Sequence, residues 1–164
     1  MPIHTEAHYR QVAADALRQA SLNEPPIPLE QLAAQIGIPV RVVQLPTFFS
    51  GALIAEDGMP VAVVNSAQRI ESGRRTLAHL LAHVLIVLSD SGERYPRDLV
   101  RDHREADVAA DELLLPERVV RNEARMWFND YRYLARAFGV TEVEMVRRMR
   151  ELGIIKARGM HPGA

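Results

Sequence analysis

The apolar run from Leu77 to Leu88 is the feature that most restricts the fold of this chain, because its only polar side chains are His79 and His83. A segment that is apolar on every side is typical of a helix buried in a core. Two histidines four residues apart lie on one face of such a helix. A buried imidazole without a partner costs about 1–3 kcal/mol, so the fold must supply partners for both.

Two interpretations of the histidine pair remain open at this point. Imidazoles at this spacing can bind one metal ion together. They can equally be core histidines that are hydrogen-bonded to backbone or to neighbouring side chains. The sequence contains no cysteine, so a metal site would have to use histidine and carboxylate ligands.

Composition excludes several classes of function. The 164 residues correspond to one domain of ordinary size, and the net charge of −1 gives no overall attraction to nucleic acid or to anionic membranes. The apolar run is too short to span a bilayer, and the first residues lack the pattern of a signal peptide. We therefore expect a cytoplasmic location and no membrane partner.

Hydrophobic periodicity predicts helices and a small sheet. A helix is expected at about 5–20 and a short one at 29–36, followed by β-rich segments at 40–45, 48–55 and 60–64. Asp57 and Gly58 form a typical hairpin turn between the last two segments. Two or three antiparallel strands are predicted, and the pattern from Ala67 onward is helical.

A second helix, from about Leu99 to Leu115, offers candidates for a third metal ligand. Small residues at 106, 109 and 110 allow close helix packing near Glu105, whose carboxylate is a plausible ligand. Otherwise Glu105 is a solvated charge. Asp107 could orient a ligand histidine, and His103 is a possible substitute ligand on a different helical face from Glu105.

The two helices together resemble the ImmA/IrrE metallopeptidases. The family's first motif reads R-F-T-x-A-H-E-x-G-H, and its second reads E-A-N-x-F-A-x-x-L-L-x-P. The matching residues of this chain are Thr76, Ala78, His79, His83, Glu105, Ala106, Ala110, Leu113, Leu114 and Pro116. A strand ending in Asn65 and a closing Leu-Ala-x-x-Phe-x-Val unit are also similar, so the resemblance spans roughly residues 29–155.

This resemblance implies an α+β fold of the zincin-like minimal metallopeptidase type, with a small antiparallel sheet and about six helices. It implies one domain over residues 1–155, including a C-terminal helical pair at 130–155. Glycines and a proline after Ile155 predict a flexible tail at 156–164. The resemblance also implies zinc on His79, His83 and Glu105, and a Cro-type helix-turn-helix repressor as protein partner.

Leu80 occupies the position of the family's general-base glutamate. Leucine cannot accept a proton, and loss of a general base typically lowers the rate about 10²–10⁴-fold. We therefore predict a kept metal site with weakened or lost proteolysis. The alternative is an active zinc endopeptidase with another base, for which the candidates are Asp107, His103, Tyr95 and Glu112.

The segment from Leu134 to Met149 reads like a helix-turn-helix, which leaves a DNA-binding regulator as a second alternative. Thr141 and Glu144 predict a capping box at the start of its second helix. However, the would-be recognition helix begins with Glu142 and Glu144, which phosphate would repel. We expect this pair of helices to be a packing element of the domain, with Arg147 and Arg148 on a solvated face. Direct binding to nucleic acid is not expected.

Overall fold

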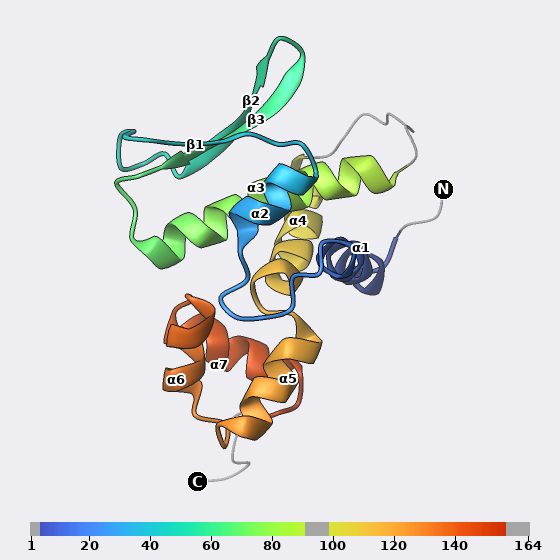
Figure 1. Cartoon of the computed structure of the whole chain (residues 1–164), viewed down its shortest axis with the longest axis vertical. Coiled ribbons are helices and arrows are strands. Elements are labelled where there is room, and N and C mark those ends of the chain that lie inside the picture. The colour runs from blue at the N-terminus through green and yellow to red at the C-terminus, as the bar shows by residue number, and fades with distance from the viewer. Residues whose placement is uncertain (1–3, 91–98, 157–164) are drawn as a thin grey trace, which may run out of the picture.

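The computed structural model describes residues 4–90 and 99–156 (Figure 1). The candidate base Tyr95 and the tail at 157–164 lie outside the described residues. The elements in chain order are α1 (Glu6–Gln19), α2 (Leu29–Gln35), β1 (Val40–Val43), β2 (Gly51–Glu56), β3 (Met59–Asn65), α3 (Ile70–Ser89), α4 (Leu99–Leu114), α5 (Glu117–Met126), α6 (Tyr131–Phe138) and α7 (Glu142–Glu151).

The sheet lies over α3 and α2 at one end of the molecule (Figure 1). Its strand order is β1-β3-β2, and β2 pairs antiparallel with β3 through the predicted hairpin, in which Asp57 and Gly58 both have positive φ. The α+β class is confirmed. The expectation of an all-antiparallel sheet is wrong, because β1 pairs parallel with β3. After β1 the chain crosses to the opposite edge of the sheet and forms β2, and the hairpin then places β3 between β1 and β2. Strand propensity does not reveal that the connection from β1 to β2 crosses the sheet in this way.

Helix α3 runs through the centre of the fold, as its apolar run predicts. Its most extensive helix contact is with α4, and α1 packs against both (Figure 1). Alanines that are fully buried make this close approach possible, since they present no bulk between the two backbones. They are Ala78 and Ala82 on α3, and Ala106, Ala109 and Ala110 on α4.

The C-terminal helices α5, α6 and α7 gather at the opposite end from the sheet (Figure 1). Thr141 and Glu144 form the predicted capping box at the start of α7. Gly139 ends α6 at a φ of +67°, and a Cβ there would come within 2.9 Å of the Arg74 side chain of α3. This glycine therefore lets the turn between α6 and α7 lie against α3.

The expectation that Arg148 lies on a solvated face is wrong. Its side chain is buried, and its guanidinium donates to the Glu112 carboxylate of α4 and to the Leu115 carbonyl. Arg147 is also engaged, because it pairs with Asp111 of α4 and with Glu151. Helical periodicity alone does not distinguish a solvated arginine from one that reaches a buried carboxylate on another element.

Within the described residues, no helix has both the length and the apolar character needed to cross a bilayer.

Candidate metal centre

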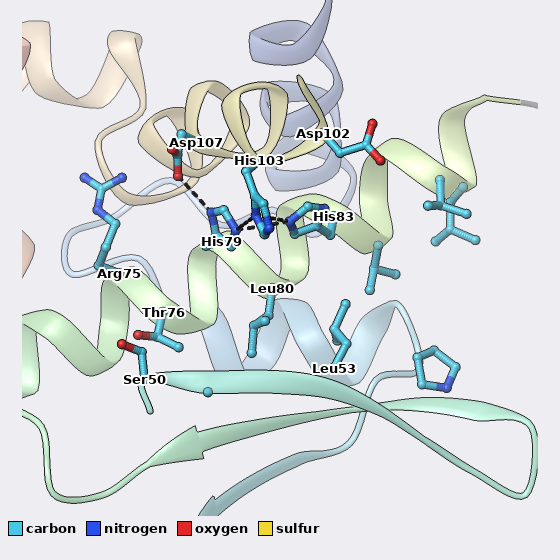
Figure 2. A pocket seen from close by; sticks show the side chains of 15 residues that line it. Ser50, Leu53, Arg75, Thr76, His79, Leu80, His83, Asp102, His103 and Asp107 are labelled. Carbon is cyan, nitrogen blue, oxygen red and sulfur yellow. Dashed lines mark hydrogen bonds and ion pairs between the residues drawn. The ribbon is translucent and has the colours of Figure 1, made fainter. Parts of the chain in front are cut away.

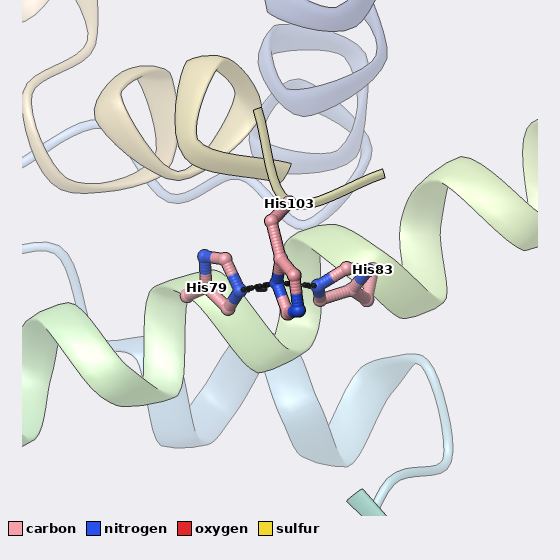
Figure 3. A group of neighbouring side chains, drawn as sticks. All are labelled: His79, His83 and His103. Atoms are coloured by element: carbon pink, nitrogen blue, oxygen red, sulfur yellow. Dashed lines mark hydrogen bonds between the residues drawn. The ribbon is translucent and has the colours of Figure 1, made fainter. Parts of the chain in front are cut away.

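Three imidazoles converge between α3 and α4 (Figure 3). His79 and His83 come from consecutive turns of α3, and His103 comes from α4. The Nε2 atoms of His79 and His83 are 3.0 Å apart, and Nδ1 of His103 is 3.0 Å and 3.2 Å from them, respectively. Tetrahedral zinc with Zn–N bonds of about 2.0–2.1 Å places neighbouring nitrogens about 3.3 Å apart, so the three atoms fit such an ion closely.

Hydrogen bonds among the three rings explain this arrangement poorly. Asp107 lies 2.8 Å from Nδ1 of His79, so that nitrogen donates its proton to the carboxylate and Nε2 carries the lone pair. Each N–H can point at only one partner, so a triangle of nitrogens cannot form three straight hydrogen bonds. A cation facing the triangle can accept all three lone pairs. The group formed by His79, His83 and His103 could therefore hold a metal ion.

Glu105, which the sequence predicts as the third ligand, lies outside this group. It is half-buried on α4, two residues beyond His103 and therefore about 200° away around the helix. Its assignment as a ligand remains a prediction. Asp107 follows His103 by four residues, so both reach His79 from one face of α4. The spacing of His103 and Asp107 was the signal in the sequence that could have indicated this face.

A cavity of about 870 Å³ opens beside the histidines, between α3 and strand β2 (Figure 2). Leu80 points into the space between α3 and the sheet, next to Leu53 of β2 (Figure 2). The remaining wall on that side is apolar, with contributions from Pro60, Val84, Val87 and Leu88. The cavity thus has a rim of histidines and an apolar floor, and Leu80 is part of the floor.

Strand β2 reaches this cavity because its first residue has no side chain. A Cβ on Gly51 would come within 2.4 Å of the Val63 carbonyl oxygen and 2.8 Å of Cγ2 of Thr76 on α3. The loop before β2 is held by the buried Asn65, whose side chain accepts from the amides of Leu45 and Ala67 and donates to the carbonyls of Pro46 and Phe49. These contacts position the edge of the sheet beside the histidine helix.

The sequence profile of the IrrE N-terminal-like domain family (Peptidase_M78) matches residues 33–150. The chain belongs to this family. No curated protein matches it significantly. A solved structure titled "Mycobacterium tuberculosis transcriptional regulator" superposes with a TM-score of 0.67 at 21% identity, over 93% of this chain and 49% of the other. At that identity the likeness shows a shared fold, and this IrrE-like chain spans about half the length of that regulator.

The IrrE-like domain secures its histidine helix through an ionic cluster one turn before His79. Arg75 donates to Asp111 of α4 and to Glu144 of α7, and Arg147 also pairs with Asp111. Burial alone would raise the pKa of the Asp111 carboxyl, but hydrogen bonds and charge from Arg147 and Arg75 outweigh it and lower that pKa. The pKa of Glu144 is lowered in the same way, by its bonds to the Thr141 amide and to Arg75 against its burial.

The described residues of the cavity contain few groups that could act as a base in place of the glutamate that the family resemblance expects at Leu80. The Asp107 carboxylate accepts the proton of His79, and His103 belongs to the group of three histidines. Glu112 is buried in the ion pair with Arg148, away from the cavity lining. Asp102, which is not among the base candidates that the sequence offers, is buried and lines the cavity beside His83 (Figure 2).

Proposed function

We propose that this chain is a metal-binding, catalytically weakened member of the IrrE N-terminal-like domain family that regulates by binding a protein partner. The observation that carries the proposal is the triangle of imidazole nitrogens, with a leucine where the resemblance expects a general base. We infer that zinc is the metal and that His79, His83 and His103 hold it.

Each residue of the site has a distinct role in this proposal. The three histidines hold the ion, and Asp107 keeps the proton of His79 on Nδ1 so that Nε2 stays available. Zinc, when bound, would supply a Lewis acid. Leu80 offers no proton acceptor, and its side chain makes the adjacent wall of the cavity apolar. The site therefore favours binding over hydrolysis.

Metal content tests the ligand set. In tag-free protein stripped with chelator and reloaded with zinc, we expect this site to bind one equivalent, so that His79→Ala and His103→Ala each bind one equivalent less than the natural chain. Glu105→Ala should retain that equivalent, because Glu105 lies outside the nitrogen group. Loss in Glu105→Ala with retention in His103→Ala would restore the ligand set that the sequence predicted. Retention in all three variants would show that the histidines are core residues.

The catalytic role of position 80 is tested by introducing the glutamate that the family resemblance expects there. We expect Leu80→Glu, loaded with zinc, to cleave a Cro-type repressor about 10²–10⁴-fold faster than the natural chain. No gain on any such repressor would contradict the view that Leu80 limits the rate. The alternative of an active endopeptidase is favoured only by Asp102 in the cavity lining. Measurable cleavage by the natural chain that disappears in Asp102→Asn would establish it.

The partner surface that we propose is the free edge of β2 together with the two phenylalanines before it. Strand β2 is an edge strand in the described sheet, and an edge can pair with an extended chain. Phe48 and Phe49 contact each other at 4.8 Å between ring centroids and are both exposed. We expect Phe48→Ser/Phe49→Ser to weaken binding to a helix-turn-helix repressor at least about tenfold in biolayer interferometry. Phe128→Ser is the control, because Phe128 is even more exposed than these two residues and follows α5, away from β2 in the sequence.

Direct DNA binding by α6 and α7 is disfavoured by the ion pairs of Arg147 and Arg148 with α4. The start of α7 presents Glu142 to solvent, which adds repulsion toward phosphate. Salt-sensitive, tight gel shifts on DNA would overturn this view. The cytoplasmic location remains a prediction from the sequence.

A further inference from the structure

A second histidine cluster lies at the beginning of the described chain, and none of its three residues lines the cavity. His4 precedes α1, His8 lies in its first turns, and Asp90 caps the end of α3. One ligand atom from each of the three residues lies within 4.8 Å of the other two. The structure describes five histidines, and each belongs either to this cluster or to the group at His79.

The local contacts leave His8 poorly satisfied. Its ring is stacked on that of His4, with centroids 4.0 Å apart and planes 16° from parallel. Nε2 of His8 is shielded from solvent and has no hydrogen-bond partner in the described part of the chain. A polar nitrogen in that position costs about 1–3 kcal/mol unless something binds it. A metal ion would satisfy it.

Asp90, the third residue of the cluster, adds a carboxylate and connects the two histidines to the end of α3. Oδ1 of Asp90 is 4.0 Å from Nε2 of His4. Two imidazoles and a carboxylate are a ligand set that zinc uses, with a fourth position left for water. The atoms are farther apart than in a bound site, where neighbours are separated by about 3.3 Å. His4 is exposed and lies outside the helix, so its side chain can move inward.

We propose that His4, His8 and Asp90 form a second zinc site, which joins the start of α1 to the end of α3. A metal there would fix the end of the same helix that carries His79 and His83. The proposal does not depend on metal at His103, because the two sites share no ligand. The two sites can therefore be tested separately in one series of variants.

The test is zinc stoichiometry by equilibrium dialysis on tag-free chain at micromolar zinc, the ion alone being the probe. The natural chain should bind about two equivalents, and both His8→Ala and His79→Ala about one. His161→Ala is the matched control, since it removes the sixth and last histidine of the sequence and should bind about two. If the site at His79 fails, His79→Ala will equal the natural chain while His8→Ala still loses one equivalent.

A second readout protects the test against simple unfolding. Zinc should slow amide hydrogen exchange in the first turns of α1 in the natural chain and in His79→Ala, and leave it unchanged in His8→Gln and Asp90→Asn. Equal stoichiometry in His8→Ala and the natural chain would overturn the proposal. So would zinc binding at this site at millimolar concentration only, or exchange in α1 that does not respond to zinc.

Discussion

The buried ion pair between Glu112 and Arg148 should control how the C-terminal helices are attached to the rest of the domain. Arg148 is 1% exposed, and it donates to the Glu112 carboxylate and, at 3.1 Å, to the Leu115 carbonyl. Burial raises the pKa of Glu112, and the charge of Arg148 opposes that rise. Removing Arg148 therefore leaves an uncompensated carboxylate inside the protein.

We predict that Arg148→Met lowers the free energy of unfolding by about 3–5 kcal/mol, the usual cost of removing one partner of a buried pair. In a domain of this size about 1 kcal/mol corresponds to about 2–4 °C, so Tm should fall by about 6–20 °C. Glu112→Gln/Arg148→Met should recover at least half of the loss. The glutamine oxygen can still accept from the Glu117 amide, which lies 3.0 Å from Oε1 of Glu112, and no charge remains.

Urea and thermal unfolding of the natural chain, both single variants and the double variant form a double-mutant cycle. The coupling should exceed about 1 kcal/mol, since residues in contact are not additive. Effects that add within about 0.5 kcal/mol would refute this reasoning, as would an Arg148→Met chain as stable as the natural one. Either result would mean that α7 is not held to α4 through this pair.

Three further outcomes follow from the site and its supports. Asp107→Ala should weaken zinc binding by about tenfold in calorimetry. This is the low end of the usual loss of metal affinity when the partner of a ligand histidine is removed, because the Asp107 carboxylate is largely exposed. Unchanged affinity would show that its contact with His79 does not support metal binding. The pKa of Asp111 is lower in the folded protein than in the unfolded chain, so its ionised carboxylate stabilises the fold above the unfolded pKa, and this stabilisation is lost as the pH falls below about 4. Asp111→Asn should therefore flatten the pH dependence of the free energy of unfolding in urea below about pH 4. A pH dependence as steep as that of the natural chain would count against this role of Asp111. Asn65→Asp should lower the free energy of unfolding in urea by about 1–3 kcal/mol or more, since a carboxylate would face the carbonyl oxygens of Pro46 and Phe49. A change below about 0.5 kcal/mol would show that other contacts hold the loop before β2.

Local signals in the chain were sufficient for much of the fold. The apolar run predicted a buried helix, the Asp57-Gly58 turn predicted the β2–β3 hairpin, and Thr141 with Glu144 predicted the start of α7. Each of these features depends on residues that are close in sequence. The parallel pairing of β1 with β3 was missed because it depends on where a connection crosses the sheet.

By itself, the sequence determined that a histidine pair lies on a buried helix, that the chain resembles a metallopeptidase family, and that leucine stands at the position of the base. Only the tertiary structure showed which residue of α4 lies beside the pair. His103 and Glu105 are two positions apart, and the rotation of α4 about its axis brings His103 to His79. That rotation is set by the packing of buried alanines on α3 against buried alanines on α4. Because the two sets lie on different helices, the sequence of either helix alone does not reveal the rotation.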